Sequence, residues 1–85
     1  MTGSVTVTVL FFAAARDAVR LDSTAITSPG PLDGNRLLEL LCERFPALAA
    51  HRALLRLAVN EEYAEPDRLL ADGDEVALIP PVCGG

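Results

Sequence analysis

Strand-forming segments lie toward both ends of this chain, and the strongest helical pattern lies between them. Residues 5–12 alternate β-branched or aromatic side chains with Thr, which predicts a half-buried strand. Residues 75–79 predict a last strand after the turn sequence of residues 71–74, and residues 35–45 predict the main helix. This order favours an α+β fold in which a mixed sheet carries one main helix packed on a face.

The main helix is indicated by apolar side chains at helical spacing. Four residues would form one apolar face: Leu37, Leu38, Leu41 and Phe45. Asn35 or Asp33 would cap its start, and Pro46 would end it.

The remaining segments complete a β-grasp (ubiquitin-like) order. Residues 13–21 favour a short helix, residues 23–27, 55–60 and 62–64 predict strands, and the Pro- and Gly-rich residues 28–31 predict a loop. In a β-grasp fold the first and last strands lie side by side at the sheet centre, so residues after Ile79 would project. We therefore expect a β-grasp domain of residues 1–79 and an extended Gly-Gly tail of residues 80–85.

Size and charge limit the classes of function. A chain of 85 residues, 51% of them hydrophobic, supports one modest core. Its seven basic residues are all Arg and are outnumbered by twelve Asp and Glu, which gives a net charge of -5. Because this charge repels phosphate backbones, we expect no nucleic-acid partner.

Cysteine spacing and apolar runs bear on the compartment. Cys42 and Cys83 match no metal or redox spacing, which indicates a reduced, cytoplasmic protein without a metal, with a disulfide as the less favoured alternative. The apolar run of residues 5–15 has no preceding positive charge, and its residues 5–9 alternate like a half-buried strand, so a signal peptide is not expected. No other apolar stretch could span a bilayer, and we expect no membrane partner.

The last residues of the sequence predict chemistry at the chain end. They read Pro80-Pro81-Val82-Cys83-Gly84-Gly85, and the prolines exclude a helix or interior strand because they fix φ and lack amide donors. The glycines have no Cβ, so a narrow channel could approach their backbone closely. Activation of a terminal carboxylate as an acyl adenylate would let sulfur replace one oxygen, giving a nucleophilic thiocarboxylate. An inert chain end is the alternative interpretation.

A resemblance to a known family is carried by residues 70–85, which read Leu-Ala-Asp-Gly-Asp-Glu-Val-Ala-Leu-Ile-Pro-Pro-Val-Cys-Gly-Gly. This segment resembles the C-terminal signature of molybdopterin synthase small subunits, the MoaD type of the MoaD/ThiS family. Residues 9–13 with Arg16 and Asp17 resemble the family's first strand and short helix, and residues 58–60 resemble its third strand. The resemblance spans nearly the whole chain.

The resemblance implies a β-grasp sulfur carrier. An E1-like enzyme would adenylate Gly85, and sulfuration would convert it to a thiocarboxylate, with Gly84 giving access. The tail would then enter the large catalytic subunit of a molybdopterin synthase, in a heterotetramer of two small and two large subunits. There, two carriers in turn would supply the dithiolene sulfurs to cyclic pyranopterin monophosphate. The small subunit would need no cofactor and would not be catalytic alone.

The resemblance also implies positions that contact partners: Phe12, Arg16, Tyr63, Ile79 and the tail residues Pro80, Pro81, Val82 and Cys83. Core packing is the alternative role for Phe12 and Ile79 because buried apolar residues are the norm. Tyr63 is the better interface candidate. Arg16 would either orient partners or remain a solvated surface charge.

The two cysteines and the single histidine receive no catalytic role. Cys83 stands where a Ser, Thr or Ala is expected, and we interpret it as a small spacer because no nearby positive charge would activate its thiol. Cys42 falls on the apolar helix face, which favours core packing. His51 has no ligand or base partner in view.

Three other functions remain open from the sequence. A sulfur carrier for thiamine, cysteine or tRNA thiolation would share the fold and tail chemistry, although Pro80-Pro81 favours the molybdopterin pathway by analogy. A ubiquitin-like protein modifier would join its tail to lysines of target proteins. A structural or binding module would carry an inert tail.

Overall fold

The computed structural model describes residues 3–79. Its elements, in chain order, are β1 (Val5–Phe11), α1 (Ala13–Val19), β2 (Ser23–Ser28), β3 (Leu32–Asp33), α2 (Gly34–Arg44), the 3-10 helix η1 (Pro46–Leu54), β4 (Arg56–Val59), β5 (Glu62–Ala64), β6 (Leu69–Leu70) and β7 (Glu75–Ile79).

Five strands form one mixed sheet in the order β2-β1-β7-β4-β5. The first strand, β1, and the last, β7, run parallel and side by side in the middle of this sheet, while the other neighbouring strands are antiparallel. A separate two-stranded ladder joins β3 to β6. The predicted α+β class and the β-grasp order are confirmed.

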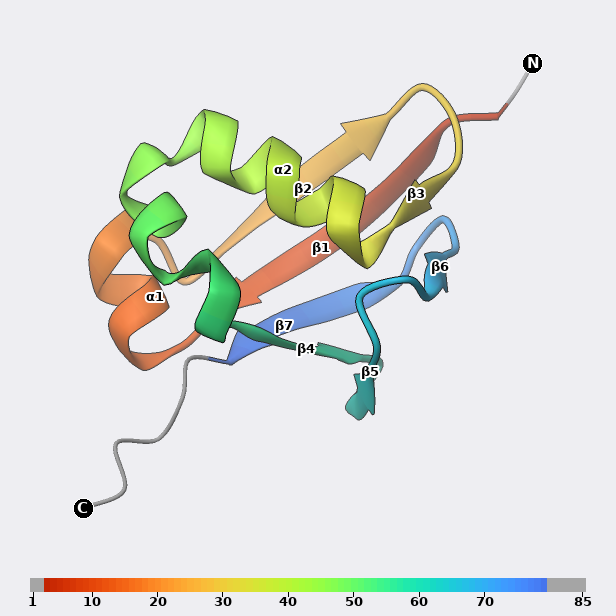
Figure 1. Ribbon diagram of the computed structural model, residues 1–85. Helices are drawn as coiled ribbons and strands as arrows, with labels where there is room; N and C mark the ends of the chain where they lie inside the picture. Colours follow the sequence, from red (N-terminus) through yellow and green to blue (C-terminus); the bar gives the residue numbers. More distant parts are fainter. Residues whose placement is uncertain (1–2, 80–85) are drawn as a thin grey trace.

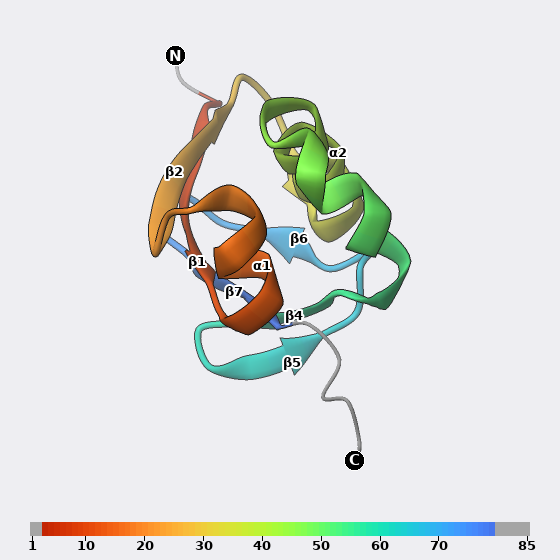
Figure 2. The ribbon, with the colours of Figure 1, turned by 90° about the vertical axis from the view of Figure 1, so that its left-hand side faces the viewer.

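The helices cover one face of the sheet (Figures 1 and 2). Alternate strand residues point toward them and are almost fully buried, among them Val7, Val9, Phe11, Leu57, Val59, Val76 and Leu78. The helices contribute Leu37, Leu38, Leu41 and Leu48 to the same cluster. The core therefore lies between the sheet and the helices. Because successive side chains of a strand point to opposite faces, the residues between the buried ones lie on the other face of the sheet.

The main helix, α2, is fixed at both ends by local bonds. The Asp33 carboxylate accepts a hydrogen bond of 2.8 Å from the Arg36 backbone N–H, so Asp33 rather than Asn35 is the N-cap. At the other end the Phe45 N–H donates to the Leu41 carbonyl at 2.7 Å, and Pro46 then opens η1. The predicted stop at Pro46 is confirmed.

Gly34 begins α2 one residue earlier than expected because the helix lies very close to the chain around Pro66. A Cβ on Gly34 would lie 2.5 Å from Leu57 Cδ1 and 2.7 Å from the Pro66 carbonyl oxygen. The Asn35 N–H donates to that same carbonyl at 2.8 Å. Only glycine fits here without moving α2 off the sheet.

Some elements differ from the sequence-based expectation. The 3-10 helix η1 and the two-residue strands β3 and β6 were not predicted. The first strand ends at Phe11 rather than Phe12, and α1 ends at Val19 because Arg20 adopts a left-handed conformation (φ 63°). Within residues 3–79, none of the helices has both the length and the apolar character needed to cross a membrane.

Candidate functional site

The carboxyl ends of β1 and β7 lie side by side at one end of the sheet because these two neighbouring strands are parallel. Phe11 and Leu78 are partners in this ladder, and both are buried on the helix-covered face. The next residues, Phe12 and Ile79, therefore turn toward the open face. Phe12 keeps an extended backbone (φ -126°, ψ 151°) and is 48% exposed, whereas Ile79 is half-buried.

A row of apolar residues crosses the open face beside this edge. Leu10 pairs with Ala77, Ala77 pairs with Ala58, and Ala58 pairs with Tyr63, which is 74% exposed. We call the following residues the open-face patch: Leu10, Phe12, Ala58, Tyr63, Ala77 and Ile79. Phe12 and Tyr63 are exposed, Leu10, Ala77 and Ile79 are half-buried, and Ala58 is buried between them. Because the accessible side chains among these are apolar or aromatic, the patch suits contact with another protein.

The β4–β5 hairpin sets the position of Tyr63. Asn60 and Glu61 form its two-residue turn, and both have positive φ (51° and 73°), as the turn types that match strand twist require. The Asn60 side chain donates to Asp74 Oδ1 at 3.0 Å and accepts from the Glu75 N–H at 3.0 Å. The hairpin is thus tied to the beginning of β7, and Tyr63 is held in register beside Ala58.

Asp74 forms the hydrogen bonds that hold the turn at the start of β7. Its Oδ2 accepts the Ala71 N–H at 2.8 Å. The hydrogen bond from Ala71, and then that from Asn60, hold the pKa of the Asp74 carboxyl below its usual value. Burial opposes them with a smaller effect, and the charge of Arg68 adds the smallest lowering effect. These contacts close the turn of residues 71–74 and are structural.

A hollow of about 490 Å³ adjoins Tyr63 at the β5 edge. Its lining includes Leu54, Arg56, Tyr63 and Glu65. Leu54 is 58% exposed, and neither it nor Arg56 was singled out from the sequence. The signal for Arg56 was available, since a charged residue alternating with Leu55 and Leu57 in a strand indicates the solvent-facing side.

Arg16 lies on α1, where its Nε is 3.3 Å from Asp22 Oδ1. Both side chains are well exposed, so this ion pair contributes little stability. The shallow hollow that Arg16 lines is formed by Asp17, Arg20, Leu21 and Asp22 and contains no residue of the open-face patch. The structure therefore brings Phe12, Tyr63 and Ile79 to one face without adding Arg16 to them.

The remaining candidates divide between the described domain and the chain end. Cys42 is half-buried and packs against the core, as predicted. Within residues 3–79 no group of three or more His, Cys, Asp or Glu side chains is arranged to hold a metal ion. The predicted tail residues lie outside the described residues: Pro80, Pro81, Val82, Cys83, Gly84 and Gly85.

Comparisons with known proteins agree with this arrangement. A family model described as ThiS family matches residues 9–85. The chain is 47% identical over 88 residues to the molybdopterin synthase sulfur carrier subunit of Aedes aegypti, and the alignment covers 95% of this chain and 90% of that protein.

Two solved structures have the same fold. The putative molybdopterin converting factor subunit 1 of Pyrococcus furiosus superposes with a TM-score of 0.83 at 30% identity, covering 92% of this chain and 99% of the other. A complex of subunits 1 and 2 of the molybdopterin-converting factor of Helicobacter pylori contains a chain with a TM-score of 0.69 at 26% identity, covering 95% of this chain and 100% of the other.

Proposed function

The chain belongs to the ThiS family, and from that premise we propose that it is the sulfur carrier subunit of a molybdopterin synthase. The observation that carries the proposal is the 47% identity to a sulfur carrier subunit of that enzyme over almost the full length of both chains. The parallel β1–β7 pair supports it, because this pair places Ile79, the last described residue, beside the open-face patch.

The proposed chemistry takes place at Gly85. The Gly85 carboxylate attacks the α-phosphate of ATP, pyrophosphate leaves, and an acyl adenylate forms on an E1-like enzyme. Hydrosulfide delivered by that enzyme's donor system then attacks the acyl carbon, the bond to AMP breaks, and a thiocarboxylate remains. This product is a soft nucleophile, as a thiolate is. The proposal requires a free carboxyl group on Gly85 and assigns Gly84 the role of letting the active site close around the backbone.

The receiving partner is a large catalytic subunit, with two small and two large subunits in the assembly. The Helicobacter pylori structure supports this part because it contains a subunit 1 with a subunit 2. We assign the open-face patch and residues 80–83 to the contact with this subunit. The sulfur would pass there to cyclic pyranopterin monophosphate, and two carriers in turn would complete the dithiolene. We place the reaction in the cytoplasm, in keeping with the cysteine spacing.

The test is an intact mass measurement on the chain purified from its native cells, with and without the large subunit. We expect a form heavier by one exchange of oxygen for sulfur, which disappears when large subunit and pterin precursor are added, with molybdopterin as the product. A protein modifier would instead give isopeptide-linked conjugates, and a carrier for another pathway would keep its thiocarboxylate in this mixture. Either result would contradict the proposal.

A further inference from the structure

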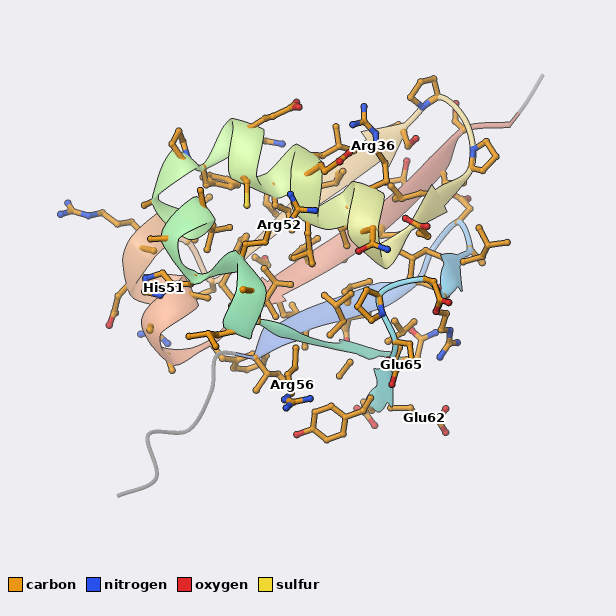
Figure 3. All side chains as sticks on the ribbon, in the orientation of Figure 1. Arg36, His51, Arg52, Arg56, Glu62 and Glu65 are labelled. Atoms are coloured by element: carbon orange, nitrogen blue, oxygen red, sulfur yellow. The ribbon has the colours of Figure 1, made fainter. Side chains whose placement is uncertain are left out.

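We propose that Arg56 is an ionic anchor in the interface with the large subunit, which presents a carboxylate to it. This inference rests on the proposed function and specifies one contact within it. Arg56 is the first residue of β4 and projects on the side of the sheet away from α2 (Figure 3). It stands beside the open-face patch at the edge where β7 ends.

Arg56 lies directly beside Ile79 in the sheet. The two residues are direct partners in the antiparallel β4–β7 ladder. Side chains at such positions lie on the same face with Cβ atoms about 4.5–5.5 Å apart. A partner that covers Ile79 must therefore also cover Arg56, which is exposed in the free chain.

Arg56 has no charged partner within the described domain. The ion pairs among residues 3–79 are Arg16–Asp22 and Arg36–Glu39. Glu65 lines the same hollow as Arg56 but forms no ion pair with it. In the open-face patch only the Tyr63 hydroxyl could accept a hydrogen bond, and among residues 3–79 the Arg56 side chain forms no hydrogen bond or ion pair, so water solvates its guanidinium there.

Covering this guanidinium removes that water. A desolvated and unpaired cation is strongly unfavourable, so an interface over Ile79 requires acceptors from the partner. A carboxylate satisfies both the charge and the planar fork of Arg through two parallel hydrogen bonds. The occupant of this position is therefore an acidic side chain of the large subunit, surrounded by apolar contacts to Phe12, Tyr63 and Ile79.

The experiment compares Arg56→Glu and Arg56→Gln with the control Arg52→Glu. Arg52 lies in η1, on the helix-covered side of the molecule (Figure 3), and Arg52→Glu changes the net charge as Arg56→Glu does. Dissociation constants for the purified large subunit are measured by calorimetry at low and high salt, with thermal midpoints as a check on folding. We expect Arg56→Glu to weaken binding about tenfold or more and Arg52→Glu to change it less than about threefold.

Arg56→Gln keeps a polar side chain that can form hydrogen bonds but removes the positive charge and the guanidinium fork. Its binding should be weaker than that of the wild type, and its salt dependence should be smaller because the ionic contact is gone. Wild-type affinity for Arg56→Glu, or an unchanged salt dependence for Arg56→Gln, would overturn the anchor while leaving the proposed function in place. Failure of the wild-type chain to bind the large subunit would overturn both.

Discussion

The two faces of the sheet are built from the same strands but are used differently. On the helix-covered face, Val9, Val76 and Leu78 are 0% exposed and pack against α2 and η1. On the open face, Leu10, Ala77 and Ile79 alternate with them and remain partly accessible. The first face supplies the burial that folds the chain. The second is free to meet a partner, and substitutions on the two faces should separate stability from binding.

The largest loss of stability is expected for Gly34→Ala, on the helix-covered side. The added methyl would press on Leu57 and on the Pro66 backbone, so α2 would have to move. We expect the free energy of unfolding to fall by about 1–3 kcal/mol. Each kcal/mol lowers the thermal midpoint of a domain of this size by roughly 4–8 °C. Calorimetry or circular dichroism measures this decrease.

The matched control is Gly30→Ala. No atom lies within 4 Å of a Cβ on Gly30, so its midpoint should remain unchanged or rise slightly. Equal effects at the two glycines would show that the close approach of α2 to Pro66 does not set the stability of this face.

An intermediate loss of stability is expected for Asp74→Ala, in the turn that precedes β7. The change leaves the Ala71 N–H and the Asn60 amide without their carboxylate acceptor. Charge-assisted bonds at a partly exposed site are worth about 1–2 kcal/mol together. Urea titration measures the loss.

The same carboxylate predicts a pH dependence of stability. Because folding lowers the pKa of Asp74, the folded state favours the ionised form, and this contribution is present above the unfolded pKa of about 4. It is lost as the pH falls through the lower folded value. Asp74→Asn should flatten the acid side of the stability curve, and an unchanged curve would show that Asp74 does not stabilise the turn.

The smallest effect on stability, with a large effect on binding, is expected for Tyr63→Ser on the open face. Tyr63 is 74% exposed, so its replacement should change stability by less than about 0.5 kcal/mol. Loss of an aromatic anchor should nevertheless weaken the complex with the large subunit, as size-exclusion chromatography would show.

Leu69→Ser provides the comparison for this variant. Leu69 is also highly exposed, at 70%, but lies on β6, outside the five-stranded sheet. The complex should survive this substitution. If both variants, or neither, lost the complex, the open-face patch would not be the contact surface.

The sequence predicted the parts of the fold that carry a period. Alternation identified β1 and helical spacing identified α2, because seven and eleven residues are enough to show a repeat. The turn sequence of residues 71–74 identified the start of β7. The two-residue strands β3 and β6 are too short to show one, and their pairing depends on the path of the chain around Pro66. The 3-10 helix η1 was missed because it begins at Pro46, which the sequence analysis interpreted only as the end of the preceding helix.

The candidate site was only partly predictable. The choice between core and interface for Phe12 and Ile79 depends on where β1 ends and on which face the helices cover, and neither is encoded in alternation alone. The structure gives both, since β1 stops at Phe11 and the helices cover Phe11 and Leu78. Arg56 became a candidate contact residue only when the structure showed that it pairs with Ile79.

The central proposal, that the sulfur chemistry takes place at the Gly85 carboxylate while the folded domain binds the partner, is tested most directly at the chain end. The wild type, a variant lacking Gly85 and a variant with one Ala added after Gly85 are compared for thermal midpoint and for molybdopterin formation with the large subunit. We predict unchanged midpoints, because an end residue has few contacts to lose, and no product from either variant, because a displaced reacting group loses its geometry. Normal molybdopterin formation by a variant with an altered end would contradict the account.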